Sequence, residues 1–122
     1  MMGVSKEHRV RTESHVAKSL RYIGEQDGVP EREFKERVVP LLDGSGVVER
    51  GYLARVAYDS ASPEVVALCL RAQPPQDVLL RDVGAVFASM FGRDQHLDIL
   101  FIDGDQEQEL ARVCPPFFES IT

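Results

Sequence analysis

A chain of 122 residues, 43% hydrophobic and 28% charged, has the size and composition of one soluble globular domain. No apolar run approaches the roughly 18 residues that a membrane span needs, and the polar N-terminus lacks the apolar core of a signal peptide. The net charge of −6 comes from residues 51–122, which hold five basic and eleven acidic side chains. An acidic half without a basic stripe argues against binding to nucleic acid or to an anionic membrane.

The first third of the chain predicts a polar N-terminal segment, one strand and one helix. Residues 1–18 form a polar N-terminal segment ahead of a single domain over 19–122, with a short helical turn expected at 13–18. Leu20–Ile23 is predicted to be a strand. Pro30 suits a helix start, and a helix is expected over residues 31–39. Its apolar stripe at helical spacing, Phe34 and Val38, continues into Leu41 and Leu42. We expect Pro40 to end or kink this helix, because it removes a backbone donor and crowds the preceding turn.

The middle of the chain predicts a hairpin followed by an amphipathic helix. Two apolar strands, residues 47–58 and 65–72, are separated by a turn-rich stretch, which is typical of an antiparallel pair. Gln73–Asp77 then interrupts the sheet, with Asp77 as the expected helix cap. The helix over 78–91 has one apolar stripe and ends before Gly92; the stripe is Leu79, Val83, Val86, Phe87, Met90 and Phe91.

The last third predicts a strand, a short helix and an apolar tail. Leu97–Ile102 has apolar residues on both sides and is expected to be covered on both faces. Asp105 with Gln108 fits a capping box for a helix over 106–113. Phe117 and Phe118 should fold back onto apolar surface. The order is β-α-β-β-α-β-α, which predicts an α+β two-layer sandwich with a mostly antiparallel sheet and the helices packed on one face.

The two cysteines offer no disulfide framework, which favours reduced thiols in a cytosolic protein. Cys69 lies in an apolar strand and is expected to be core, whereas Cys114 is better placed for exposure. Neither has a base nearby in the sequence to activate it as a nucleophile. His8, His15 and His96 are expected to be solvated, since no ligand spacing for a metal surrounds them.

The acidic run over 103–109 is explained by helix capping and the helix dipole. Counted from Asp103, the positions that a calcium loop needs as glycine and glutamate hold Gln108 and Cys114, so that pattern fails. Weak magnesium binding is the remaining alternative.

Four residues form a candidate binding surface: Tyr52, Arg55, Arg71 and Asp98. Arg55 and Arg71 interrupt apolar strands that the hairpin brings together. One interpretation is that both arginines face solvent on an open sheet face and pair with Asp98. The other is a docking surface where a guanidinium receives a carboxylate from a ligand or partner, beside Tyr52.

Several segments together resemble one known family: Gly51–Val56, Val66–Leu70, His96–Phe101 and Pro116–Phe118. They are similar to the C-terminal domain of the bacterial enhanced-serine-sensitivity (SseB) proteins, over about residues 38–118. Members of that family often carry a further N-terminal domain, which a chain of this length does not include. The resemblance implies a bacterial cytosolic protein and assigns no catalytic residue.

We therefore predict a non-enzymatic, cytoplasmic module without a cofactor. It would act through its sheet face or edge on a protein partner or on a second copy of itself. The alternative is a regulatory domain that binds a small ligand such as an amino acid, by analogy with other β-α-β-β-α-β sandwiches. An enzyme that uses Cys69 or Cys114 ranks last.

Overall fold

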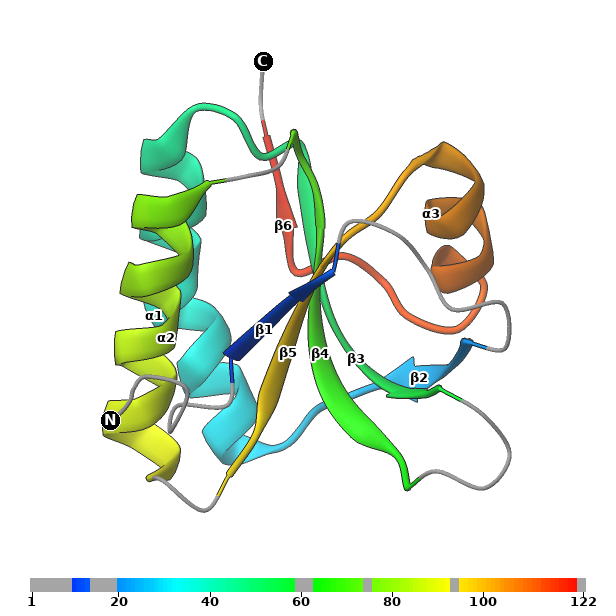
Figure 1. The fold of residues 1–122 in the computed structure, drawn as a ribbon, viewed down its shortest axis with the longest axis horizontal. Coiled ribbons are helices and arrows are strands. Elements are labelled where there is room, and N and C mark those ends of the chain that lie inside the picture. Colours follow the sequence, from blue (N-terminus) through cyan, green and yellow to red (C-terminus); the bar gives the residue numbers. More distant parts are fainter. Residues whose placement is uncertain (1–9, 14–19, 59–62, 74–75, 93–94, 121–122) are drawn as a thin grey trace.

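The structure is a computed structural model that describes residues 10–13, 20–58, 63–73, 76–92 and 95–120 (Figure 1). It contains three helices and a six-stranded sheet within those residues. In chain order the elements are β1 (Val10–Glu13), β2 (Arg21–Glu25), α1 (Val29–Ser45), β3 (Arg50–Ala57), β4 (Val65–Arg71), α2 (Asp77–Phe91), β5 (Leu97–Phe101), α3 (Gly104–Ala111) and β6 (Phe118–Glu119).

The sheet has the order β1-β5-β4-β3-β2, and β6 pairs with the end of β3 that β2 leaves free. The predicted hairpin is confirmed, because β3 and β4 run antiparallel from Arg50↔Arg71 to Val56↔Val65. A helical crossover through α2 then places β5 parallel to β4, as a parallel connection requires. Antiparallel pairs outnumber parallel ones, and the predicted α+β class is confirmed.

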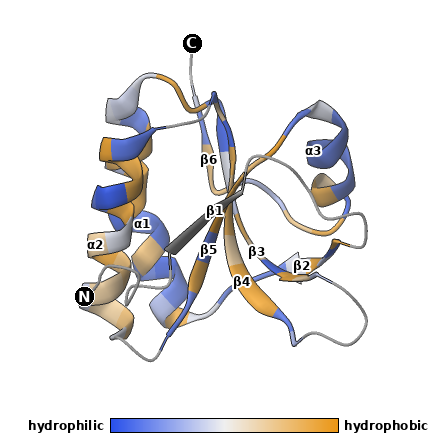
Figure 2. Ribbon diagram, viewed as in Figure 1, coloured by the Kyte–Doolittle hydropathy of each residue, from blue (hydrophilic) through white to orange (hydrophobic). Residues whose placement is uncertain are grey.

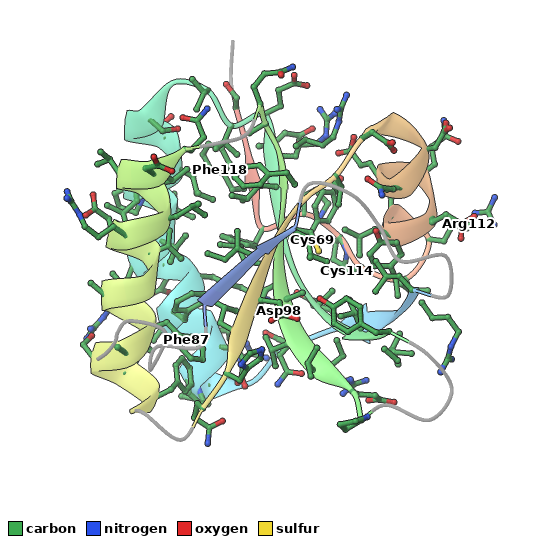
Figure 3. All side chains as sticks on the ribbon, in the orientation of Figure 1. Cys69, Phe87, Asp98, Arg112, Cys114 and Phe118 are labelled. Atoms are coloured by element: carbon green, nitrogen blue, oxygen red, sulfur yellow. The ribbon has the colours of Figure 1, made fainter. Side chains whose placement is uncertain are left out.

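One face of the sheet, the α1/α2 face, carries the larger hydrophobic core. The predicted stripes of both helices pack there on alternate residues of the strands, and Phe87 points from α2 toward the sheet (Figure 3). Burying these side chains stabilises the fold by about 1.5 to 3 kcal/mol each. The fully buried members include Phe34, Val38, Leu42, Leu68, Val83, Leu97 and Ile99.

The opposite face, the α3 face, holds a second, smaller core. Tyr52, Ala54 and Cys69 from the strands pack with Leu110 of α3 and with Cys114. The expectation that all helices lie on one face is therefore wrong for α3, which lies across the sheet from α1 and α2 (Figure 1). The reason is that β3 and β5 are apolar on both sides, so the second face also has to be covered. Polar residues predominate on α3 (Figure 2), which leaves Leu110 as its one buried residue.

Helix α1 continues through Pro40 to Ser45, so the expected end at residue 39 is wrong. Proline removes the hydrogen bond to the carbonyl of Glu36, but Pro40 and Glu36 are both exposed, so water can satisfy that carbonyl. Val38 and Leu42 are completely buried on the other side of the helix. Their burial outweighs the loss of one hydrogen bond.

The helix caps differ from two of the expectations. Asp77 is the first residue of α2 and makes no capping hydrogen bond, since the N-cap position is Gln76. The capping box of α3 is formed by Asp103 and Gln106, two residues before the predicted pair. The Asp103 carboxylate accepts from the Gln106 N–H at 2.8 Å, and the Asp103 N–H donates to the Gln106 side chain at 2.7 Å. The same four-residue spacing fits both positions in the sequence, and the earlier one starts the helix directly after β5.

The two ends of the described chain also join the sheet. Strand β1 pairs in parallel with β5, although residues 1–18 were expected to lie ahead of the domain. Most of the expected helical turn over 13–18 lies outside the described residues. At the other end, Phe118 is buried and pairs with Gly51, so the predicted return of the apolar tail is confirmed.

Candidate functional site

Tyr52 and Arg71 meet on the α3 face, at the carboxylate of Glu107. The register pairs Arg50 directly with Arg71, so two guanidinium groups lie on adjacent strands below α3. Arg50 donates to both oxygens of Glu107, the Nη2 to Oε1 bond being 3.0 Å. Arg71 Nε donates to Oε1 at 3.0 Å and Tyr52 Oη to Oε2 at 2.6 Å. We call these four residues the Glu107 cluster.

The donors of the Glu107 cluster all meet the one carboxylate of Glu107, and the exposed Glu49 lies 3.7 Å from Arg50 as a second carboxylate. Hydrogen bonds from Arg50 lower the pKa of Glu107 to about 2, with further contributions from Tyr52 and Arg71, against the opposing effect of burial. Burial, followed by the hydrogen bond to Glu107, raises the pKa of Tyr52. Glu107 is therefore ionised at neutral pH and occupies the donors of the two candidate residues. The arrangement holds α3 against the sheet.

Asp98 lies apart from that cluster and is completely buried. Its Oδ1 lies 2.6 Å from His96 Nε2, and its Oδ2 accepts from Tyr58 Oη at 2.5 Å. The expected ion pairs between Asp98 and the two arginines are not formed. Arg71 pairs with Glu107 instead, and Arg55 pairs with Glu64. His96 was predicted to be a solvated histidine and is instead half-buried against Asp98. Its position two residues before Asp98, directly ahead of β5, is the signal that could have revealed the pair.

Arg55 lies on the other side of the sheet from Tyr52 and Arg71. Successive strand residues alternate between faces, so positions 52 and 55 of one strand cannot share a face. The Arg55 side chain is 46% exposed, and its Nε lies 3.5 Å from Glu64 Oε1. The four candidate residues are thus divided among three places.

Both cysteines are buried, Cys69 completely and Cys114 to 1% exposure. They lie between the sheet and α3 (Figure 3), so the expected exposure of Cys114 is wrong. Its Sγ lies 3.5 Å from the carbonyl oxygen of Leu53, because the chain turns inward after α3. Burial raises the pKa of the Cys114 thiol to about 11 and raises that of Cys69 as well. Both thiols are therefore protonated and unreactive at neutral pH.

A pocket of about 280 Å³ opens on the α1/α2 face, and we call it the phenylalanine pocket. Its apolar wall comes from four elements and consists of Phe34, Phe87, Phe91, Leu53 and Val66. Its polar rim consists of Gln26, Glu31, Gln95 and His96. The rings of Phe87 and Phe91 lie 4.8 Å apart, and Phe34 meets Phe87 edge-on at 5.7 Å. Helical spacing predicts that these rings belong to the core, but it does not show that the face they cover is incompletely filled.

The glutamate on the rim is held in place by its neighbours. Gln26 Nε2 donates to Glu31 Oε2 at 2.9 Å. Oε1 lies over Gly28, where an added Cβ would approach it to 2.5 Å. The two contacts fix the carboxylate at the start of α1, where the helix dipole favours a negative charge.

Neither a metal-binding cluster of side chains nor a membrane-spanning helix is found among the described residues. No group of three or more His, Cys, Asp or Glu side chains there could hold a metal ion, and Asp103 and Glu107 of the acidic run serve the cap and the cluster. Within the same residues, no helix is long and apolar enough to cross a membrane.

Comparisons with known proteins supply no relative from which a role could be transferred. No protein-family model matches the chain, and neither a curated protein nor a solved structure matches it with significance. The resemblance to the enhanced-serine-sensitivity family stays a prediction. Functional arguments therefore depend on the residues of this chain.

Proposed function

We propose that the chain is a non-catalytic, small-molecule-binding module and that the phenylalanine pocket is its binding site. The observation that carries the proposal is the composition of the pocket: an apolar wall of five side chains under a rim of four polar ones. Ligand sites in proteins are concave, mostly apolar and oriented by a few polar groups. The volume lies just below the range of about 300 to 1,000 Å³ that drug-sized ligands occupy. A compact metabolite is the size that fits.

A non-catalytic role is supported by the state of the reactive side chains. Burial raises the pKa of both thiols, so that neither is a thiolate at neutral pH. Glu107 is engaged by three donors on the far face of the sheet from the pocket. As the family resemblance implies, we place this module in a bacterial cytosol.

The proposal is tested with a thermal-shift panel of amino acids, amines, carboxylates and nucleosides. A ligand at 100 times its Kd stabilises the native state by about 2.7 kcal/mol, which for this size of domain raises Tm on the order of ten degrees. Val66→Phe would fill the pocket from its wall and should abolish the shift. Val78→Phe adds the same volume at a side chain that is 61% exposed and outside the pocket, and it should leave the shift intact. A panel without any shift, or a shift that Val66→Phe retains, would refute the proposal.

A protein-docking role is the second candidate, and the exposed Arg55–Glu64 pair favours it. Of the four residues in the predicted binding surface, Arg55 is the one that keeps an exposed side chain. A second copy of the chain or a partner with an acidic group would be its occupant. Arg71 is unsuitable for the test, because Arg71→Glu would place a second carboxylate against Glu107.

This second role is tested by comparing proteins that co-purify with the wild type and with Arg55→Glu. The matched control is Arg37→Glu, an exposed charge reversal on α1. Self-association is measured in parallel by sedimentation. Identical partners and an identical oligomeric state for Arg55→Glu and the wild type would exclude docking at this surface.

A further inference from the structure

The charge of the phenylalanine pocket points to the class of ligand. No lysine or arginine lines it, and Glu31 is the carboxylate on its rim. The whole chain carries a net charge of −6, which raises the local concentration of cations and lowers that of anions. We propose that the pocket binds an organic amine with an apolar body, in preference to an amino acid or a carboxylate. This inference builds on the proposed function.

The charge of Glu31 is not neutralised by an ion pair among the described residues. The nearest basic side chains of α1 are already engaged: Arg32 pairs with Asp27, and the buried Lys35 pairs with Glu25 at 2.7 Å. The neutral amide of Gln26 orients Glu31 without balancing its charge. An ammonium group would supply the missing positive charge in a half-buried position, where a charge-assisted hydrogen bond is stronger than at the surface.

The wall of the pocket suits the rest of such a ligand. Phe34, Phe87 and Phe91 offer apolar surface, and aromatic rings also attract a cation that approaches their faces. An amino acid would bring a carboxylate as well. No lysine or arginine lines the pocket to receive it, and the imidazole Nε2 of His96 on the rim is already hydrogen-bonded to Asp98. Arg55 is the neighbour in register with Val66 of the wall, but its side chain is 46% exposed and does not line the pocket. The carboxylate would therefore lose its water without gaining a partner.

Three probes that share one aromatic body separate these cases: phenethylamine, phenylalanine and phenylacetate. Their Kd values are measured by calorimetry or amide-shift titration of the full chain at pH 7. We expect phenethylamine to bind about tenfold or more tightly than phenylacetate, with phenylalanine between them, since one charge-assisted bond contributes that factor. Glu31→Gln should weaken phenethylamine about tenfold and remove the preference. Glu33→Gln, an exposed change of the same charge on α1, should alter neither.

Two controls keep the outcome specific. Val66→Phe should abolish phenethylamine binding, which distinguishes the pocket from general attraction to an acidic surface, and an unchanged Tm for Glu31→Gln shows that the fold is intact. If phenylalanine or phenylacetate binds as tightly as phenethylamine, or if Glu31→Gln binds the amine normally, the inference is wrong while the pocket remains a binding site. If none of the three binds, the amine inference is also wrong, and the broad panel then decides whether the proposed function stands.

Discussion

Replacing Glu107 with glutamine should destabilise the fold by about 2 to 3 kcal/mol at pH 7. Its side chain is 12% exposed and accepts hydrogen bonds from Arg50, Arg71 and Tyr52. Glu107→Gln keeps the shape and an acceptor for Tyr52 but leaves two guanidinium groups side by side, with the exposed Glu49 carboxylate, 3.7 Å from Arg50, as their remaining counter-charge. Hydrogen bonds to charged groups contribute about 1.5 to 3 kcal/mol each. A fall in the pKa of Glu107 from 4.5 to about 2 corresponds to about 3 kcal/mol.

The pH dependence of this loss follows from the same pKa. The folded pKa of Glu107 is lower than its ordinary value of 4.5, so its stabilisation is fully present above pH 4.5 and is lost as the pH falls toward 2. The free energy of unfolding of the wild type minus that of Glu107→Gln should therefore shrink by about 2 kcal/mol between pH 7 and pH 3. Taking this difference cancels the titration of the other carboxylates.

The assay is urea unfolding followed by far-UV circular dichroism, with both proteins measured at each pH. Glu109→Gln is the control, since it makes the same charge change at an exposed position of α3 and should alter stability by less than about 0.5 kcal/mol. A loss below about 0.5 kcal/mol for Glu107→Gln at pH 7 would contradict the reasoning. So would a loss of equal size at pH 7 and pH 3.

Three further outcomes test the fold. Asp103→Ala should lower the free energy of unfolding by about 1 kcal/mol through loss of the α3 cap, whereas Asp105→Ala should leave it nearly unchanged; the reverse order in urea unfolding would favour the cap that the sequence predicts. Pro40→Ala should raise the free energy of unfolding by about 1 to 2 kcal/mol by restoring a helical hydrogen bond, and a fall would mean that the proline is needed for the path of α1. Cys69 and Cys114 should resist iodoacetamide in the native protein at pH 7 and react fully in urea, as read by mass spectrometry; rapid native labelling of Cys114 would show that its site opens.

Elements whose apolar residues recur with a clear helical or strand periodicity were predictable from the sequence. Elements that depend on contacts with distant parts of the chain were not. Helix α2 was expected within one residue of its observed bounds, because one stripe of apolar residues and a terminal glycine define it. Helix α1 was expected to end or kink at Pro40, because local rules count the lost hydrogen bond, whereas the observed helix continues to Ser45. These rules do not count the burial of Val38 and Leu42 against β-strands far along the chain. Strand β1 was missed for the same reason, since its paired residues in β5 lie 87 positions further along the chain, Val10 opposite Leu97.

Two of the four candidate residues do lie together, but the four do not form one surface. Arg71 and Tyr52 stood out as polar groups in apolar strands, and they do share a cluster. Their partner Glu107 is 36 and 55 residues away, and nothing in the acidic run distinguishes it from Glu109 until α3 is placed on the sheet. Alternation along the strand was enough to separate Arg55 from Tyr52. Because positions 52 and 55 are three apart on one strand, this rule alone shows that the two side chains point to opposite faces of the sheet.

The division of roles between the two faces explains why the pocket left no signal of its own. On the α3 face, a short polar helix with one buried residue, Leu110, is secured by the charges around Glu107. On the α1/α2 face, two long helices bury enough apolar surface to hold themselves in place, so the fold does not require every gap between them and the strands to be filled. Phe34 and Phe87 are core residues and pocket walls at once. The sequence shows their role in the core, because a buried helix face requires apolar residues at regular spacing. An unfilled volume between four elements requires no such spacing and therefore leaves no pattern in the sequence.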